Sequence, residues 1–570
     1  QYIYENSNSV GVVVEKPALL KSIAADPGLK SAKAGAMPKF AIVLFAKGKS
    51  GEEIKAEMGL PAEMKVVTYK ELLAMKRPLK EAAVDPDDPA ALVYTSGTTS
   101  YPKGVVLRHS NLLHQVHNNS FNRANNRKYD PWVGDVFVSI LPCWHIFERT
   151  AEYYTLSRGA KLVYSNIRNF KTDLVKYKPH FLIAVPRLFE TIYKGVQQNF
   201  SSQKGIKKKL VTFFTASCML YMKAKRVVTN MVIRQKAPDI LEKAWAALTL
   251  AVTWPLAMLA DKMVWSKVRE GLGGRMKVMV SGGSSLSPVL EDFYEMIGGR
   301  VIVGYGLTET SPVIANRVAE HNLVGSVGKP PPNTQIKVVD VETRKELPIG
   351  EKGLILARGP QIMREYMSNP EATREAIDDE GFFNTGDLGM VNPPTGDIVI
   401  TGRAKDTIVL SNGENIAPQP IEDLLIGNCA TVDQMMLVGQ DERFLSALAI
   451  VSPSGLESQG LITKDHATRL NNLLGATPLT TGIAGTAEEM EKETKILQED
   501  PAIQKAVLNE IKKESKKAKL RPWENVQDVR VLLEPFTMTN GLLTQTLKVK
   551  KNVATDRFEP LITDMYKEDK

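Results

Sequence analysis

Short apolar runs bounded by turn-forming residues are the feature of this sequence that most restricts its fold. Five such runs, rich in β-branched residues and separated by stretches of helical character, occupy residues 10–15, 40–45, 90–95, 135–142 and 276–283. Runs of this length are typical of strands buried on both faces, as in parallel sheets connected through helices. The sequence therefore predicts an α/β fold, in which mixed and mostly parallel sheets are flanked by helices.

The length of the chain and a change of texture near residue 400 predict two domains. A chain of 570 residues is too long for one hydrophobic core. After the turn-rich segment TGRAKDTIVLSNGENIAPQPIED, a strand-like run precedes a charged helical region at about 486–519. We expect a large domain over residues 1–402 and a smaller α+β domain over residues 403–570, with the boundary at Gly402–Lys405. The start at Gln1 resembles the middle of a fold, so the large domain is expected to be truncated at its N-terminus.

Residues 199–270 differ from the rest of the large domain and predict a helical insertion. A lysine-rich start is followed by apolar residues at nearly helical spacing. Residues 244–260 contain no charged side chain, but this run is slightly shorter than the ~20 residues that span a bilayer, and Pro255 interrupts it. Three interpretations stay open: an insertion that packs on the protein, an amphipathic element at a membrane surface, and a transmembrane helix.

Charge and cysteine content exclude some classes of function. Lysine and arginine outnumber aspartate and glutamate by 73 to 64, and the net charge of +9 suits anionic ligands or an anionic membrane surface. This charge is too diffuse to indicate nucleic acid binding, so no nucleic acid partner is expected. The three cysteines are far apart, which argues against a disulfide framework or a zinc site and favours a reducing compartment.

Residues 95–104, TSGTTSYPKG, have the composition of a phosphate-binding loop. Hydroxyl residues, two glycines and Lys103 follow a strand-like run, and backbone N–H groups, hydroxyls and an ammonium can together surround phosphate oxygens. The loop is not of the Walker type, because Pro102 stands where the second glycine belongs and Gly104 follows the lysine in place of serine or threonine. From these residues alone, a polar loop between a strand and the next helix is the alternative.

Five segments downstream of this loop follow in a fixed order, and with it they resemble the adenylate-forming, AMP-binding enzymes. They are SGGSSLS (281–287), GYGLTET (304–310), NTGDLG (384–389), GRAKDTI with NGENIAPQPIE (402–422), and LTQTLKVKK (543–551). The resemblance extends from residue 90 to 551. It implies an acid–thiol ligase in which a carboxylate attacks the α-phosphate of ATP to give acyl-AMP and pyrophosphate, and a thiol then displaces AMP. It also implies that the C-terminal domain is a mobile lid.

Three more segments resemble the long-chain fatty acyl-CoA synthetase branch of that family. They are LPCWHIFERT (141–150), VPRLFETIYKGV (185–196) and LRPWENVQDVRVL (520–532). The residues NGENIAPQ and NGLLTQTLKVKK are most similar to plant plastid acyl-activating enzymes, some of which load fatty acids onto acyl carrier protein. The resemblance implies a long-chain fatty acid as substrate and the phosphopantetheine thiol of CoA or acyl carrier protein as acceptor. It further implies a plastid location, with the cytoplasm as the alternative, and the insertion adds peripheral membrane contact to the expected partners.

The resemblance also implies roles for individual residues at the nucleotide. Glu309 would bind Mg²⁺, for which a carboxylate is a suitable ligand, and Thr308 would contact the α-phosphate. Asp387 would accept hydrogen bonds from the ribose hydroxyls, and Arg403 would reach the ribose or a phosphate. The residues that would surround the β- and γ-phosphates are Thr95, Ser96, Gly97, Thr98, Thr99 and Lys103. Those that would surround the adenine are Gly283, Ser284, Tyr305 and Gly306.

Four residues are expected at the acyl group and at the hinge between the domains. Lys548 would bridge the fatty carboxylate and the α-phosphate, where it would offset the repulsion between two anions. His145 would line the acyl site, with a buried, hydrogen-bonded histidine as the alternative, and Trp144 would shape the acyl channel or pack in the core. Lys405 occupies the family's pivot position, where an exposed residue can absorb a change of φ and ψ.

Two other functions stay open from the sequence. The first is a ligase for a different carboxylic acid, either aromatic or medium-chain, against which the insertion and the HIFER residues argue. The second is a non-catalytic relative that binds a nucleotide or an acyl group. The presence of Lys548, Glu309 and Asp387 argues against that second function.

Overall fold

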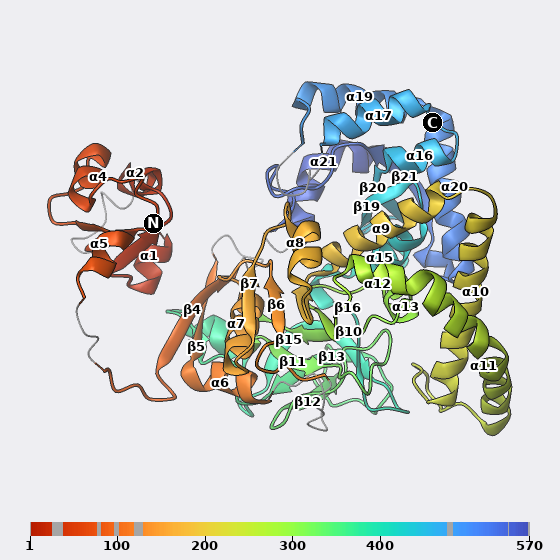
Figure 1. Cartoon of the computed structure of the whole chain (residues 1–570), viewed down its shortest axis with the longest axis horizontal. Helices are drawn as coiled ribbons and strands as arrows, with labels where there is room; N and C mark the ends of the chain where they lie inside the picture. The colour runs from red at the N-terminus through yellow and green to blue at the C-terminus, as the bar shows by residue number, and fades with distance from the viewer. Residues whose placement is uncertain are drawn as a thin grey trace. The chain divides into compact units, whose positions relative to one another are not determined.

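The computed structural model describes residues 2–25, 38–76, 81–95, 102–118, 129–475, 483–544 and 547–567. It divides into two compact units, Gln1–Asn111 with Met363–Ala376, and Leu112–Ile362 with Ile377–Lys570. Figure 1 follows the chain through both of them from red to blue. The predicted boundary at residue 402 falls inside the second unit.

The first unit contains a small three-stranded parallel sheet in the order β1-β2-β3. Its strands are β1 (Gly11–Val14), β2 (Phe40–Val43) and β3 (Lys65–Thr68), so the strands predicted at 10–15 and 40–45 are confirmed. Leu20 of one helix and Ile54 of another are fully buried against the strands. The helices of this unit are α1 (Tyr2–Ser7), α2 (Pro17–Ala25), α4 (Gly51–Met58), α5 (Tyr69–Ala74) and α14 (Pro370–Ala376).

The strand predicted at 90–95 exists, but it belongs to an antiparallel sheet. Strand β4 (Pro89–Thr95) forms a hairpin with β5 (Lys103–Arg108), and β14 (Glu365–Tyr366) pairs with the other edge of β5. Antiparallel neighbours need no helical crossover. The expectation of a parallel strand followed by a helix is therefore wrong here, and the loop within residues 95–104 connects two adjacent strands.

The second unit is built on a six-stranded sheet in the order β11-β10-β9-β8-β6-β7, in which only β11 is antiparallel. Consecutive strand residues enter different cores: Leu182 and Met279 pack on one face, and Phe181 and Val278 on the other. Burial of both faces explains the continuous apolar runs in the sequence and confirms the α/β class. The strands are β6 (Val136–Ser139), β7 (Lys161–Tyr164), β8 (Phe181–Ala184), β9 (Val278–Ser281), β10 (Val301–Gly306) and β11 (Val313–Asn316).

Helices cover both faces of this sheet. Phe189 of α9 and Tyr294 of α13 are fully buried on the Leu182 face, where their rings meet edge to face at 5.2 Å between centroids. Ala151 of α7 packs on the Phe181 face. The helices are α6 (His109–Asn118), α7 (Ile146–Ser157), α8 (Phe170–Tyr177), α9 (Pro186–Ser202) and α13 (Pro288–Met296).

A four-stranded antiparallel sheet follows in the second unit, in the order β12-β13-β15-β16. Buried and half-buried residues alternate along the first part of β15, and this period of two places Asp387 on the buried side. The NTGDLG motif therefore lies on a strand, and its Asp387 carboxylate faces the interior. The strands are β12 (Gln335–Val339), β13 (Gly353–Arg358), β15 (Phe383–Val391) and β16 (Ile398–Arg403).

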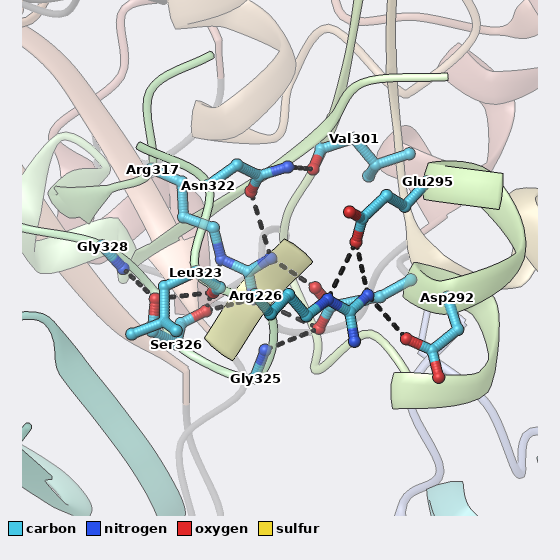
Figure 2. Close-up of polar contacts among 11 residues, drawn as sticks. Arg226, Asp292, Glu295, Val301, Arg317, Asn322, Leu323, Gly325, Ser326 and Gly328 are labelled. Carbon is cyan, nitrogen blue, oxygen red and sulfur yellow. Dashed lines mark hydrogen bonds and ion pairs between the residues drawn. The ribbon is translucent and has the colours of Figure 1, made fainter. Parts of the chain in front are cut away.

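Helices α10 (Gly205–Val228) and α11 (Ile240–Ala260) form a hairpin, which a π-helical turn (Asp261–Trp265) and α12 (Ser266–Gly271) continue. Helix α10 is anchored to the body, since Phe214 and Cys218 join the core of the six-stranded sheet. Arg226 of α10 also forms an ion pair with Asp292 at 2.7 Å and donates to Glu295 at 3.0 Å, both on α13 (Figure 2).

The C-terminal residues form a separate α+β domain, as predicted. Its sheet has the order β19-β20-β21, with the first pair antiparallel and the second parallel. The strands are β17 (Ile408–Val409), β18 (Asn415–Ile416), β19 (Val432–Val438), β20 (Leu445–Val451) and β21 (Val526–Leu532). The helices are α15 (Pro418–Asn428), α16 (Pro453–Ser458), α17 (Lys464–Leu474), α19 (Ala487–Glu499), α20 (Pro501–Lys517) and α21 (Lys551–Met565).

A buried ion pair ties α13 to the segment after β11 (Figure 2). Arg317 is only 2% exposed, and its Nε donates to the Ser326 carbonyl at 2.7 Å and its Nη1 to Asn322 at 3.3 Å. Nη1 and Nη2 both donate to the Glu291 carboxylate, and Nη2 also donates to the Ser326 carbonyl. Glu291 also accepts the N–H of Gly325 at 3.2 Å. A guanidinium has five N–H donors, and this network occupies all of them.

We predict that Glu291→Ala destabilises the second unit by about 3–5 kcal/mol, because it leaves the buried Arg317 cation unpaired. The matched control is Glu380→Ala, which breaks an exposed pair with Lys337 at 2.8 Å and should lower the stability far less, because water screens and replaces such a pair. Differential scanning calorimetry measures both variants. Equal shifts in the two variants would contradict the importance given to the buried pair.

Candidate active site

The candidate site lies at the carboxyl ends of the parallel strands. From β7 the chain crosses β6 to form β8 on its other side, so the strand order reverses between β6 and β8. Open α/β sheets bind ligands in the crevice at such a reversal, outside the carboxyl ends. The loop after β6 carries Trp144 and His145, the turn after β9 carries Gly283 and Ser284, and Tyr305 is the next-to-last residue of β10.

The buried carboxylate of Asp387 joins two other predicted residues. The Tyr305 hydroxyl donates to Oδ2 of Asp387 at 2.7 Å, and Nε of Arg403 donates to Oδ1 at 2.8 Å. Burial and the neighbouring Asp387 charge raise the pKa of Tyr305 well above its usual value, which keeps this hydroxyl a donor. The structure therefore brings together residues from β10, β15 and β16, and Tyr305 lies 82 positions before Asp387 in the sequence.

Lys548 lies beside this cluster, in a turn of the C-terminal domain. The Thr544 N–H donates to the Lys548 carbonyl at 2.8 Å, and the Lys548 N–H donates back to the Thr544 hydroxyl at 3.1 Å. Desolvation by the surrounding protein and the nearby Arg403 cation lower the pKa of Lys548 to about 8, while Asp387 acts in the opposite direction. The residue still keeps exposed surface, so its ammonium is crowded but within reach of a ligand.

His145 is half-buried and caps the N-terminus of α7. Its Nδ1 accepts the N–H of Phe147 at 3.2 Å, so the ring proton belongs on Nε2. Desolvation and the charge of Lys548 lower the pKa of His145 to about 4, which keeps the imidazole neutral near pH 7. The neighbouring Trp144 is 59% exposed, so it does not pack in the core.

Glu148 is a residue of this region that the sequence analysis did not single out. It follows His145 by one helical turn, is 2% exposed and accepts a hydrogen bond from Ser139, the last residue of β6. Burial raises the pKa of Glu148 to about 7. The sequence signal was its position within the HIFER segment, but nothing in that pattern shows that the carboxylate points inward.

The GYGLTET motif forms the end of β10 and a short 3-10 turn, Thr308–Thr310. A Cβ on Gly306 would lie 1.7 Å from the carbonyl oxygen of Pro312, so only glycine fits there. Thr308 and Glu309 are half-buried in the turn. Within the described ranges no cluster of three metal-ligating side chains occurs. Mg²⁺ is commonly held by one or two carboxylates together with phosphates and water, and Glu309 can supply one such carboxylate.

The C-terminal domain contacts the glycine turn through α15. Gly283 has a positive φ of 83°, which glycine adopts without strain. Gln419 donates to the hydroxyls of Ser284 at 3.1 Å and Ser285 at 2.9 Å, and Ser285 donates to Asp423. The predicted turn is therefore covered by two side chains, Gln419 and Asp423, that the sequence analysis had not assigned.

The phosphate-loop residues belong to the first unit. Thr95 is the last residue of β4 and is paired with Lys103, the first residue of β5; the Lys103 ammonium lies 4.9 Å from the ring centre of Tyr366. The hairpin ends are thus placed, whereas Ser96, Gly97, Thr98 and Thr99 lie outside the described residues. Lys405 is exposed in the 3-10 turn Ala404–Asp406, directly after β16.

Solved structures with the same fold are adenylation domains. One belongs to a carboxylate reductase of Mycobacterium chelonae, at TM-score 0.65 and 18% identity, and covers 99% of this chain and 74% of that chain. Another belongs to a carboxylic acid reductase of Segniliparus rugosus in complex with AMP and a co-purified carboxylic acid, at TM-score 0.64 and 21% identity, with 99% and 76% covered. These likenesses show that the chain has the fold of an adenylation domain.

The sequence comparisons identify the family. The AMP-binding enzyme model matches residues 1–367, and the model of the AMP-binding enzyme C-terminal domain matches residues 405–473. The chain belongs to the AMP-binding enzyme family. It is an adenylate-forming, acyl-activating acid–thiol ligase that binds ATP and AMP.

Similar proteins of Arabidopsis thaliana carry more detailed names. The chain is 37% identical to probable acyl-activating enzyme 16, chloroplastic, over 99% of this chain and 76% of the relative. It is 35% identical to the chloroplastic long-chain-fatty-acid–acyl-carrier-protein ligase AEE15, over 99% and 74%. It is 34% identical to the peroxisomal long chain acyl-CoA synthetase 6, over 93% and 68%.

We expect the Lys548 amine to titrate near pH 8 and its pKa to rise in Arg403→Gln, because a neighbouring cation disfavours a second one. Carbon-13 NMR of reductively methylated lysines follows the titration, and Lys548→Arg identifies the signal. Arg358→Gln, at an exposed arginine of the antiparallel sheet, is the control and should leave the value unchanged. An unchanged pKa in Arg403→Gln would show that the two cations do not interact.

Proposed function

We propose that this enzyme activates a long-chain fatty acid with ATP to acyl-AMP and transfers the acyl group to the phosphopantetheine thiol of CoA or acyl carrier protein. The observation that carries the proposal is the cluster of Lys548, Arg403, Asp387 and Tyr305, which combines a mobile cation with a fixed carboxylate. The names of two similar proteins, a long-chain-fatty-acid–acyl-carrier-protein ligase and a long chain acyl-CoA synthetase, support the long-chain substrate.

Lys548 would act in the first half-reaction, in which a carboxylate oxygen forms a bond to the α-phosphorus and the bond to the β-phosphate oxygen breaks. Two anions must approach each other, and a cation between them lowers that repulsion. With a pKa of about 8 in the free enzyme, Lys548 is mostly protonated at neutral pH. Phosphate and carboxylate groups nearby would raise this pKa further and keep the ammonium charged.

Asp387 and Tyr305 would hold the nucleoside. A carboxylate has about four acceptor sites, and the two hydrogen bonds from Tyr305 and Arg403 leave room for ribose hydroxyls. Because the Tyr305 hydroxyl is fixed to Asp387, its ring has one orientation, which suits stacking on adenine. The turn at Gly283, Ser284 and Gly306 would supply backbone beside the base.

We propose two groups of residues as ligands of the triphosphate. Thr95, Ser96, Gly97, Thr98, Thr99 and Lys103 are the proposed ligands of the β- and γ-phosphates, and Thr308 of the α-phosphate. Glu309 would hold Mg²⁺, which when bound neutralises charge on the departing pyrophosphate. The protein's part in this step is to orient the phosphates and to exclude water.

The loop after β6 would hold the fatty carboxyl group. His145 presents Nε2–H while its Nδ1 is fixed by the Phe147 N–H, so it is a neutral donor near pH 7. Such a donor can orient a carboxylate without holding it as tightly as an ion pair would. Trp144, exposed beside it, would form part of the wall of the acyl channel.

The second half-reaction would require the C-terminal domain to turn at Lys405. The thiol sulfur then forms a bond to the acyl carbon, AMP leaves, and the thiol proton goes to solvent or base. CoA and acyl carrier protein present the same phosphopantetheine thiol, so the acceptor is decided by docking on the protein surface. We further propose a plastid location, because two similar proteins are chloroplastic.

Pyrophosphate release with acids of different length tests the substrate. Each buried methylene contributes ~0.8 kcal/mol, so shortening the acid from 16 to 12 carbons should remove ~3 kcal/mol, roughly a hundredfold in kcat/KM. Thioester formation with CoA and with holo-acyl carrier protein, measured side by side, distinguishes the acceptors, and Lys548→Ala is the inactive control. Best activity with aromatic or medium-chain acids would replace the long-chain proposal, and no release with any acid would indicate a non-catalytic relative.

The hinge proposal predicts that Lys405→Pro separates the two half-reactions. Proline fixes φ and should restrict the domain rotation, while the arrangement with Lys548 beside Asp387 is retained. Adenylate formation should then stay within about twofold, and thioester formation should slow by at least tenfold. Single-turnover measurements resolve the two steps, and equal loss of both would contradict the hinge role.

A further inference from the structure

Helix α11 exposes an uncharged, apolar surface along most of its length. Trp245 is 71% exposed, Leu248 56%, Val252 65% and Leu259 46%, and they lie at a spacing that places them on one side of the helix. No charged residue occurs between 244 and 260. Solvent-facing sides of helices ordinarily carry charged or polar residues, so this surface is not adapted to water.

The opposite side of α11 is fixed to the protein. Ala246, Thr253, Ala257 and Ala260 are buried, and α10 packs beside α11 (Figure 1). Helix α10 in turn is held to α13 through Arg226 (Figure 2). Among the described residues, Ile240–Gly271 is the helical stretch long and apolar enough to cross a membrane, yet only 17% of its apolar window is buried. Helix α11 is therefore not a core helix. It is also not free to span a bilayer, because one of its sides packs on the protein.

The positive charge of the protein is concentrated in this same hairpin rather than diffuse. Residues 204–271 contain thirteen lysines and arginines and four acidic residues, a net charge of +9 that equals the net charge of the whole chain. Two of the acids are already paired, Glu242 with Arg234 and Asp261 with Arg269. Exposed lysines flank the apolar surface, including Lys236 before it and Lys262 and Lys267 after it.

We propose that the α10–α11 hairpin docks on an anionic lipid bilayer, with α11 lying in the plane of the interface. A helix of 21 residues is about 32 Å long, and its apolar side would enter the boundary between headgroups and acyl chains. Trp245 and Trp254 suit this depth, because tryptophan is enriched where an apolar body meets a polar surface. The flanking lysines would face the anionic headgroups.

The charge distribution favours a membrane over the other occupants of such a surface. A second copy of the chain would place one +9 hairpin against another, and like charges oppose such an interface. An acidic carrier protein would match the charge, but a transient partner would leave the apolar side of α11 in water for much of the time. A bilayer satisfies the apolar side and the lysines together.

Flotation of the full chain with liposomes tests the proposal. Vesicles of phosphatidylcholine with 30% phosphatidylglycerol should bind the protein at least tenfold better than phosphatidylcholine alone, and 0.5 M NaCl should weaken that binding. Trp245→Glu with Val252→Glu should lower the binding at least tenfold. The matched control is Ile496→Glu, since Ile496 is 41% exposed on α19 of the C-terminal domain and its substitution should leave binding unchanged.

A second variant tests the charge without altering the apolar side. Lys207→Gln, Lys208→Gln and Lys209→Gln together should reduce binding to the anionic vesicles by at least tenfold, whereas the same change at Lys512, Lys513 and Lys516 of α20 should have a smaller effect. Pyrophosphate release with a soluble acid reports that each variant is folded and active. Failure of the wild-type protein to release pyrophosphate would contradict the proposed function. Loss of flotation in a variant that still releases pyrophosphate would support the membrane surface.

Three results would overturn the proposal. The first is a wild-type protein that does not float with anionic vesicles. The second is a concentration-dependent dimer, seen by sedimentation equilibrium, that Trp245→Glu with Val252→Glu dissociates while flotation persists. The third is loss of binding to holo-acyl carrier protein in that variant without loss of flotation. The last two would assign the surface to a second copy or to the carrier protein.

Discussion

The carboxylate of Asp387 is the group on which the arrangement of the site depends. It is buried on β15, and two strands of two different sheets supply its hydrogen bonds, through Tyr305 on β10 and Arg403 at the end of β16. Its charge also acts on Lys548, which comes from the C-terminal domain. A buried carboxylate must be compensated, and these hydrogen bonds fix the parallel sheet, the antiparallel sheet and the start of the C-terminal domain relative to one another.

The C-terminal domain meets the rest of the unit through polar contacts. Asp433 is contacted by Lys194 and accepts from Arg187 through its carbonyl at 3.3 Å, and Gln419 reaches the glycine turn. Lys194 and Asp433 each keep about a third of their side-chain surface exposed, 36% and 33%. Exposed pairs of this kind contribute little, and water can replace them. A modest free-energy change would therefore be enough to move the C-terminal domain from the orientation that brings Lys548 to Asp387 into a different one.

Much of the fold was predictable because burial on both faces leaves a clear pattern, as in β6 and β9. The pairing of β4 was not, since an apolar run does not distinguish a parallel strand from one side of a hairpin. The motifs supplied Tyr305, Asp387 and Arg403 separately, but only the structure shows that Tyr305 and Arg403 both bind Asp387, Tyr305 from 82 positions away. Glu148 and Gln419 were missed because their importance depends on tertiary contacts. The exposure of α11 was missed because an uncharged helix ordinarily predicts burial.

The concentration of charge on one hairpin matters for the apolar substrate that we propose. A long-chain fatty acid partitions into bilayers, with each methylene contributing ~0.8 kcal/mol, so its concentration is highest where α11 is proposed to lie. Because the rest of the chain has a net charge of zero, attraction to an anionic surface acts on the hairpin alone and orients the molecule. Helix α10 carries this orientation to the body through Arg226 and α13, whose Glu291 anchors Arg317. The insertion is thus tied to the six-stranded sheet by this ion pair as well as by the packing of Phe214 and Cys218 in its core.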